Sequence, residues 1–305
     1  MVLTRRRLLR VGAATGVAAL AGCGNPLGGG GREAGFGEWL YEPGTVTDTD
    51  HYLALRYEPS VVAEHASALD GDVYDLLRAA GSGTRDLLGL GFAGTDAQLG
   101  FGNNGVLTGD FDADDVTATL TDADFVNDGT AGDFDTYVGP DEDAAVALTD
   151  GTAVVARSTG LFGSADNARL ILRALLDVQT GAIESYVEDS ADFGTLVDEL
   201  GDGAIQSART HPETDATDTD EGAFAGEVAR GVTSSFVDDG IETTFALVFN
   251  ESADIDTGDV EDWVEAAGDG TFANFESVDV STSERTALVT GTEPTREYDF
   301  YLEGF

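Results

Sequence analysis

The clearest pattern of hydrophobic and polar positions in this chain is a helical repeat near its middle. Apolar residues recur three or four positions apart at Ala168, Ile171, Leu172, Leu175 and Leu176. This spacing places them on one face and predicts an amphipathic helix, with Ser164 as its N-terminal cap. Shorter periodic segments predict further helices over residues 58–69, 72–80, 112–120, 191–200 and 259–267.

Alternating and continuous apolar runs predict strands between these helices. The first strand is predicted over residues 51–57, and two more, 96–102 and 105–111, flank a turn at Asn103-Asn104-Gly105. Residues 144–148 and 152–156 flank Asp150-Gly151, and such Asn-Gly and Asp-Gly pairs favour hairpins. In the last third, a long strand pair turning at residues 238–240 precedes the last helix, and three strands end at residue 302.

Two segments of the chain repeat one order of elements, which is a strand, a helix and three strands. The first comprises 105–111, 112–120 and strands near Tyr137, Val146 and Val154; the second comprises 243–249, 259–267 and strands near Phe275, Ala287 and Tyr298. The segments share little sequence identity, so duplication stays open. We expect an α+β fold with antiparallel or mixed sheets and helices on one face, and two β-α-β-β-β repeats as a candidate organisation.

Composition divides the chain into five parts. We expect a signal peptide over residues 1–22, a glycine-rich tether over 23–38, an α+β domain or first half over 39–209, an acidic loop or linker over 210–222, and a second α+β half over 223–305. The 14 residues 24–37 would span roughly 20 Å as a flexible coil, enough to hold a domain just off a membrane.

The N-terminus has the three parts of a secretory signal peptide. Arg5 and Arg6 belong to a basic patch, residues 11–20 are apolar and uncharged, and Leu20-Ala21-Gly22-Cys23 follows. The apolar run is too short for a membrane-spanning helix, which needs about 20 residues. The paired arginines resemble the twin-arginine export signal, and the last four residues resemble a lipobox. This resemblance implies export, cleavage before Cys23 and lipid attachment to Cys23.

The charge composition is strongly acidic. All 15 basic residues are arginines, against 58 acidic residues, and the net charge is −43, while 42% of the residues are hydrophobic. Such a charge opposes folding at low salt, but the screening length falls to about 3 Å at 1 M salt. The composition resembles that of haloarchaeal proteins, so the chain resembles haloarchaeal twin-arginine-exported lipoproteins. Disorder is the alternative, but aromatic and β-branched residues recur throughout in periodic segments and favour a folded body.

Charge and cysteine content exclude several partners and chemistries. Scattered arginines in so acidic a chain argue against nucleic-acid binding, which needs clustered basic residues, and an anionic membrane would repel the body. Cys23 is the only cysteine, so the mature body has no disulfide, thiolate zinc site or cysteine nucleophile. The absence of lysine excludes Schiff-base chemistry and a P-loop. No cofactor is predicted.

Three motifs suggest binding chemistry, and each has a simpler interpretation. Residues 89–94 fit G-x-G-x-x-G, but a strand-like run follows where a dinucleotide site needs a helix. Residues 110–115 are rich in aspartate, but Asp115 and Thr121 stand where an EF-hand needs glycine and glutamate, and helix capping explains these aspartates. The three histidines, His51, His65 and His211, share no ligand spacing. No metal site is predicted.

Asn250 begins the only N-glycosylation sequon, Asn250-Glu251-Ser252, and is the candidate modification site. Several aromatic residues could line a groove, although the helical position of Trp263 favours core packing. The others are Trp39, Tyr41, Tyr298 and Tyr301. No G-x-S-x-G elbow is present, and no carboxylate pair for glycoside hydrolysis can be singled out, so no catalytic residue is assigned.

These observations favour a lipoprotein anchored to the outer face of the cell membrane of a salt-loving archaeon. Its expected role is non-enzymatic, as a binding or cell-envelope interaction module whose partner is an envelope protein or a small molecule. A secreted hydrolase that uses carboxylates is the first alternative. A solute-binding lipoprotein of a transporter is the second, although such receptors usually have parallel βαβ lobes, and this chain has hairpins.

Overall fold

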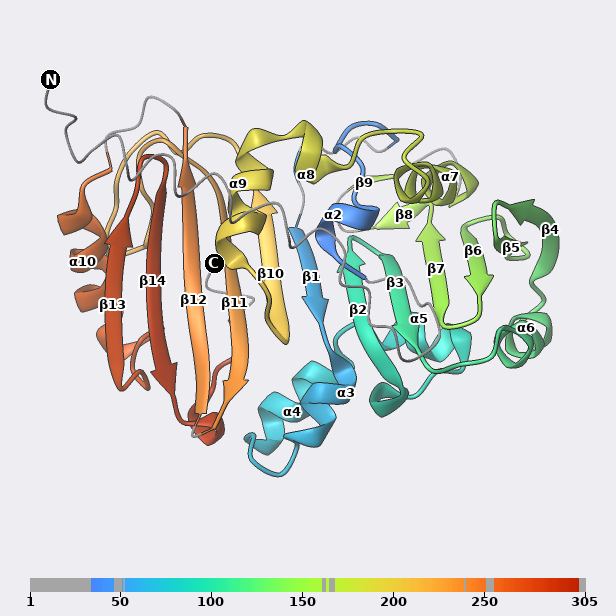
Figure 1. Cartoon of the computed structure of the whole chain (residues 1–305), viewed down its shortest axis with the longest axis horizontal. Coiled ribbons are helices and arrows are strands. Elements are labelled where there is room, and N and C mark those ends of the chain that lie inside the picture. The colour runs from blue at the N-terminus through green and yellow to red at the C-terminus, as the bar shows by residue number, and fades with distance from the viewer. Residues whose placement is uncertain are drawn as a thin grey trace, which may run out of the picture. The chain divides into compact units, whose positions relative to one another are not determined.

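A twelve-stranded sheet forms the framework of the protein, in the order β13-β14-β12-β11-β10-β1-β2-β3-β7-β6-β5-β4 (Figure 1). In this computed structural model the described residues are 34–46, 51, 53–160, 163–164, 168–238, 240–250 and 255–301. Every neighbouring pair of strands in the sheet is antiparallel. The α+β class predicted from the sequence is therefore confirmed.

The strands of the large sheet are β1 Leu53–Tyr57, β2 Thr95–Phe101, β3 Asn104–Gly109, β4 Val126–Ala131, β5 Phe134–Val138, β6 Ala144–Thr149, β7 Thr152–Arg157, β10 Ile205–Thr210, β11 Glu227–Val237, β12 Gly240–Phe249, β13 Ser277–Thr282 and β14 Thr286–Glu293. A separate ribbon pairs β8 Thr159–Gly160 with β9 Gly163–Ser164.

The helices are α2 Phe36–Trp39, α3 Pro59–Glu64, α4 Gly71–Ala79, α5 Ser82–Leu88, α6 Ala113–Asp122, α7 Ala168–Gln179, α8 Tyr186–Asp189, α9 Ala191–Leu200 and α10 Thr257–Ala266, with 3₁₀ turns η1 Phe92–Gly94, η2 Ala267–Asp269 and η3 Thr295–Glu297. In the described part of the chain, none of these helices combines the length and hydropathy that a membrane crossing requires.

Helices cover both faces of the sheet, which corrects the expectation of helices on one face. On the first face, α2, α7, α8 and α9 pack over strand residues such as Ala246 and Val248. On the second face, α3, α4 and α10 pack over residues such as Phe245 and Leu247, while α5 and α6 cover β3, β6 and β7. Neighbouring residues of β12 thus enter opposite cores. Because both faces of these strands are apolar, both need a covering layer.

Local sequence signals account for most helix boundaries. The Asp112 side chain accepts a 2.8 Å hydrogen bond from the Asp114 N–H and caps α6, and Ser190 caps α9 in the same way through the Phe193 N–H at 3.2 Å. The periodic apolar residues of α7 are buried, as predicted. Ser164 is not the cap that the sequence suggested, because it lies in β9 and pairs with Thr159.

The expected repeat is present in topology but not in strand count. After the β2–β3 hairpin and α6, the four strands β4 to β7 follow, and β7 lies beside β3. After the β11–β12 hairpin and α10, the two strands β13 and β14 follow, and β14 lies beside β12. Neither half has the three strands predicted. Phe275 and Tyr298 lie outside strands, although both side chains contribute to the core of the second face. The acidic segment 211–226 links β10 to β11 within one continuous sheet.

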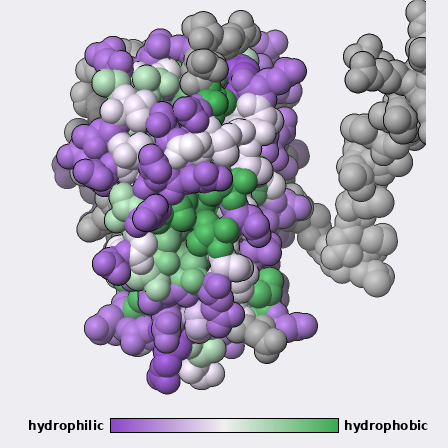
Figure 2. All heavy atoms as spheres, turned by 90° about the vertical axis from the view of Figure 1, so that its left-hand side faces the viewer, coloured by the Kyte–Doolittle hydropathy of each residue, from purple (hydrophilic) through white to green (hydrophobic). Residues whose placement is uncertain are grey.

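The β13 end of the sheet leaves part of the core of the second face open to solvent. Figure 2 shows apolar surface between polar margins at this end. Partly buried apolar side chains of β13, α10 and the segment between them pack against the core here, and they include Val264, Ala267, Phe275, Val278 and Val280. The opposite edge strand, β4, is exposed and polar in its middle, so the two edges differ in character.

Candidate functional site

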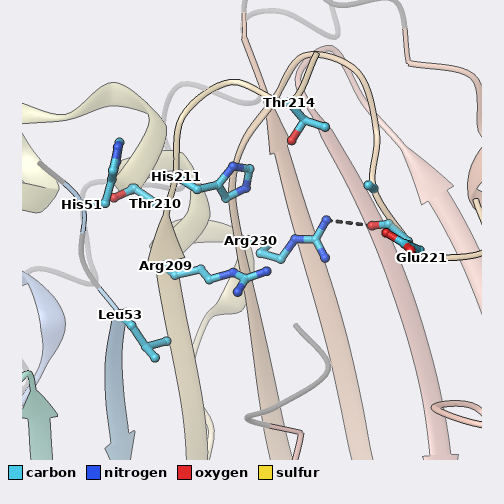
Figure 3. Close-up of a pocket in the computed structure, with 10 residues that line it drawn as sticks. His51, Leu53, Arg209, Thr210, His211, Thr214, Glu221 and Arg230 are labelled. Carbon is cyan, nitrogen blue, oxygen red and sulfur yellow. Dashed lines mark hydrogen bonds between the residues drawn. The ribbon is translucent and has the colours of Figure 1, made fainter. Parts of the chain in front are cut away.

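A cavity of about 470 Å³ lies where β1, β10 and β11 meet the loop of residues 211–226. We call it the anion pocket, for reasons given below. Its lining residues come from β1 and the residue His51 before it, from β10 and β11, and from the loop (Figure 3): His51, Leu53, Arg209, Thr210, His211, Thr214, Glu221, Gly222, Ala223 and Arg230. The volume is within the range of about 300–1,000 Å³ that is usual for small-molecule sites.

Strand register places the two arginines of the pocket side by side. Arg209 of β10 is the cross-strand partner of Leu53 of β1 and of Arg230 of β11. Side chains that are direct partners in an antiparallel sheet point to the same face. All three therefore project from the second face, the one that carries Tyr57 and Val232. Figure 3 shows the Arg209 and Arg230 side chains extending next to each other below His211.

Arg230 is fixed and neutralised within the protein. Its guanidinium forms a two-pronged ion pair with the fully buried Glu227 carboxylate, and one nitrogen donates a 2.7 Å hydrogen bond to the Gly222 carbonyl. The same carboxylate lies 2.9 Å from His211 Nε2, while Nδ1 lies 2.8 Å from the Pro212 carbonyl. Both ring nitrogens of His211 thus face acceptors. Through these contacts, Glu227 and Arg230 of β11 hold the loop of residues 211–226 against the strand.

Arg209 has no such partner. It is half-buried, its Nε is buried without a hydrogen bond, and no described carboxylate forms an ion pair with it. Burial lowers the pKa of Arg209, the positive charge of Arg230 lowers it further, and the Glu227 carboxylate raises it in part. Arginine nevertheless stays protonated in proteins. The pocket therefore contains a positive charge whose hydrogen-bonding capacity is unused.

The loop that closes the pocket is held by its own backbone. Thr214 N–H donates to the Glu227 carbonyl at 2.9 Å, and Gly226 N–H donates to the Thr214 carbonyl at 2.8 Å. An isolated bridge pairs Asp218 with Ala223. Gly222 has a φ of +65°, and a Cβ there would lie 2.5 Å from Trp263 Nε1, so only glycine fits against α10. The lining groups of the loop are therefore in defined positions.

This arrangement is suited to binding an oxyanion. An arginine fork matches the two oxygens of a carboxylate or phosphate, and the resulting bonds are stronger than neutral hydrogen bonds. The Thr214 hydroxyl points into the same space (Figure 3), whereas the buried Thr210 hydroxyl accepts a 3.1 Å hydrogen bond from Tyr186 Oη on the first face of the sheet. Among the described residues, no three His, Cys, Asp or Glu side chains gather in a way that could hold a metal ion. Glu221 is the only carboxylate among the lining residues, so the pocket lacks the carboxylate pair of a glycoside hydrolase.

The structure brings together two of the three histidines, which the sequence did not connect. His51 and His211 line the pocket, whereas His65 stacks on Phe236 with ring centroids 4.0 Å apart. Asn250 follows β12 and is partly buried, and its N–H donates to the Gly226 carbonyl at 2.8 Å. Arg5, Arg6 and Cys23 lie outside the described residues.

The remaining motifs have structural roles. Residues 89–94 run from the end of α5 through η1 into β2, the reverse of the strand-to-helix order of a dinucleotide site. The predicted core packing of Trp263 is confirmed, because it packs against Phe245 and Phe272. Trp39 and Tyr41 are fully buried. Tyr298 and Tyr301 are also buried.

Sequence analysis missed Arg209 and Arg230. Each stands inside a strand rather than in a loop, and the strand β10 itself was not predicted. The available signal was the scarcity of basic residues, with 15 arginines against 58 acidic residues, but it does not single out this pair, since Arg56 and Arg157 also stand in strands. Their proximity follows only from the pairing of β10 with β11.

Comparisons with known proteins do not identify a family or a function for the chain. No family model and no curated protein sequence matches the chain. Crystal form III of TP0453 is similar over 87% of this chain and 96% of that one, with a TM-score of 0.45 and 12% identity. Crystal form I of TP0453 has a TM-score of 0.44 and 11% identity over 87% of this chain and 94% of that one. Similarity at this level supports no functional argument.

Proposed function

We propose that this chain is a lipid-anchored, non-enzymatic binding module that captures a small oxyanion, a carboxylate or phosphate, in the anion pocket. The export signal and lipobox resemblance supports a location at the outer face of the cell membrane of a salt-loving archaeon. The observation that supports binding is the unpaired guanidinium of Arg209 beside Arg230 in a cavity of about 470 Å³. An arginine left without a carboxylate in so acidic a chain is available to an external anion.

Oxyanions should bind in preference to chloride. Molar chloride surrounds any protein of a brine organism, and a bare positive charge would hold chloride. The planar fork of Arg209 and the Thr214 hydroxyl instead offer several directed hydrogen bonds, which a carboxylate or phosphate can accept together. Partial burial also limits the screening of this interaction by salt.

The carboxylate hydrolase receives no support from the pocket, because Glu221 has no second carboxylate among the lining residues. A transporter receptor shares the binding role proposed here. Its usual parallel architecture differs from this antiparallel sheet, so delivery to a transporter is not part of the proposal.

Thermal unfolding of the full chain in molar sodium chloride tests the proposal, with acetate, citrate, phosphate and sulfate as added ligands. A ligand of the native state raises the unfolding temperature by mass action. We expect at least one oxyanion to do so in the wild type and in Arg173→Gln, a control that removes an exposed arginine of α7. The rise should be lost in Arg209→Gln.

The control separates binding from general salt effects. Sulfate and phosphate stabilise many proteins by exclusion from the surface, and that effect would be equal in all three proteins. Arg209→Gln without ligand should unfold at the same temperature as the wild type or higher, because it removes a half-buried unpaired charge. If no oxyanion gives a shift that depends on Arg209, the proposed function is wrong.

A further inference from the structure

A second cavity of about 540 Å³ adjoins the anion pocket on the same face of the sheet. The two cavities share Leu53, which lines both. The second cavity continues across β1, β2 and β3 to the end of β7, and the start of α5 forms its other side: its lining includes Leu55, Thr84, Gln98, Gly100, Asn103 and Arg157. We call the combined space the trough.

The floor of the trough follows from strand register. Leu55 of β1 and Gly100 of β2 are direct cross-strand partners, and both line the second cavity. Leu55 supplies apolar surface, and Gly100 supplies no side chain. At Gly100 an added Cβ would be no closer than 3.9 Å to another atom, so the backbone does not require glycine there. The missing side chain is what hollows the floor.

A second unpaired arginine stands at the far end of the trough. Arg157 is the last residue of β7, and its backbone N–H donates a 2.8 Å hydrogen bond to Asn104 Oδ1. Its partly buried side chain lines the cavity. The other described arginines have side-chain partners, except the exposed Arg296 and Arg209 itself. Both partly buried unpaired arginines therefore belong to one trough.

We propose that the trough takes an elongated ligand with an acidic group at each end and an apolar body between them, of the long-chain dicarboxylate class. This inference rests on the proposed oxyanion site at Arg209. One acid binds Arg209, the chain lies over Leu53 and Leu55, and the second acid binds Arg157. The apolar middle and the charged ends of the trough match those of such a ligand.

The spacing of the strands sets the length of the ligand. Arg209 and Arg157 are four strand spacings apart, which at about 4.8 Å each is roughly 19 Å between backbones. Both side chains can lean inward, so the acids can be closer together than that. A carbon chain extends about 1.25 Å per bond, given C–C bonds of about 1.5 Å. Dicarboxylates of about 10–16 carbons fit, whereas a four-carbon one spans only about 4 Å.

Calorimetric titration of the full chain in molar salt tests whether ligand length matches the distance between Arg209 and Arg157. The probes are linear α,ω-dicarboxylates of 4, 8, 12 and 16 carbons, the 12-carbon monocarboxylate, and acetate. We expect the 12-carbon dicarboxylate to bind at least tenfold more tightly than either the four-carbon dicarboxylate or the 12-carbon monocarboxylate. Arg157→Gln should reduce its affinity to that of the monocarboxylate.

Two further variants control for charge and folding. Gly100→Val fills the floor with a residue that strands favour and should abolish the preference for long dicarboxylates without changing acetate binding. Arg173→Gln, with the same charge change as Arg157→Gln, should bind all probes as the wild type does. If acetate binding depends on Arg209 but chain length and Arg157 have no effect, the trough inference is overturned and the oxyanion site stands. If no probe binds, the trough inference and carboxylate binding at Arg209 are both overturned, and the phosphate and sulfate measurements above then decide the oxyanion site.

Discussion

Glu293 is a buried carboxyl group whose replacement tests the electrostatics of this fold. It ends β14 and is fully buried. Its Oε1 accepts a 2.8 Å hydrogen bond from Tyr301 Oη, whereas its Oε2 has no hydrogen-bond partner. Burial raises the pKa of Glu293 from 4.5 to about 7; the bond from Tyr301 lowers the value in part, and the negative charge of Asp299 raises it.

This shift makes stability depend on pH in a defined direction. Between pH 4.5 and about 7 the folded protein keeps a proton on Glu293 that the unfolded chain has released. The contribution of Glu293 to the free energy of unfolding is therefore largest below this window and falls as pH rises through it. At about 1.4 kcal/mol per pKa unit, the full shift corresponds to about 3 kcal/mol. This is an upper limit, because neighbouring side chains can relax around the carboxylate.

Glu293→Gln removes the titration and keeps an oxygen that can accept the Tyr301 hydrogen bond. We expect the variant to gain stability relative to the wild type as pH rises from 4.5 to above 7, by up to about 3 kcal/mol. Urea unfolding at several pH values and one fixed molar salt concentration measures this difference. Glu261→Gln, which neutralises an exposed carboxylate of α10, should follow the wild type. Parallel curves for Glu293→Gln and the wild type would refute the reasoning.

Three further substitutions have expected outcomes elsewhere in the chain. Cys23→Ser should release the protein from membranes in cell fractionation, and continued membrane association would count against lipid attachment at that residue. Gly222→Ala should lower the free energy of unfolding by about 1–3 kcal/mol, since it forces a non-glycine residue to a φ of +65° against Trp263; unchanged urea unfolding would contradict this. Asn250→Gln should lower the mass of protein purified from its own host if Asn250 is glycosylated, and an identical mass apart from the substitution would exclude modification there.

Local patterns predicted the elements whose residues carry their own signals. The helix over residues 191–200 has the predicted bounds, because Ser190 caps it and its apolar positions have helical spacing. The hairpin of β6 and β7 closes at Asp150-Gly151 as expected, and Gly151 has the positive φ that such a turn requires. The turn between β2 and β3 lies instead at Gly102-Asn103, two residues before the predicted Asn104-Gly105 pair.

Local sequence patterns could not predict the anion pocket, because the pocket includes the end of β10. This strand reads Ile-Gln-Ser-Ala-Arg-Thr, with polar side chains on both faces, so neither alternation nor a hydrophobic run marks it. Its position between β1 and β11 is set by pairing with residues that are distant in sequence, such as Leu53, which faces Arg209. Long-range pairing of this kind decides which charged groups meet, and a single sequence does not encode it in any short window.

The charge balance of the chain explains why the arginine pair of the anion pocket is asymmetric. With 58 acidic residues and 15 arginines, every arginine has carboxylates in excess, and Arg230 has the usual arrangement in its buried pair with Glu227. Arg209 has none because its neighbours on the second face, Leu53 and Arg230, are fixed in register by main-chain pairing and carry no acid. The central strands therefore hold this charge in place without neutralising it. A half-buried unpaired charge lowers the stability of the empty protein, and an oxyanion that pairs with it restores that stability when it binds.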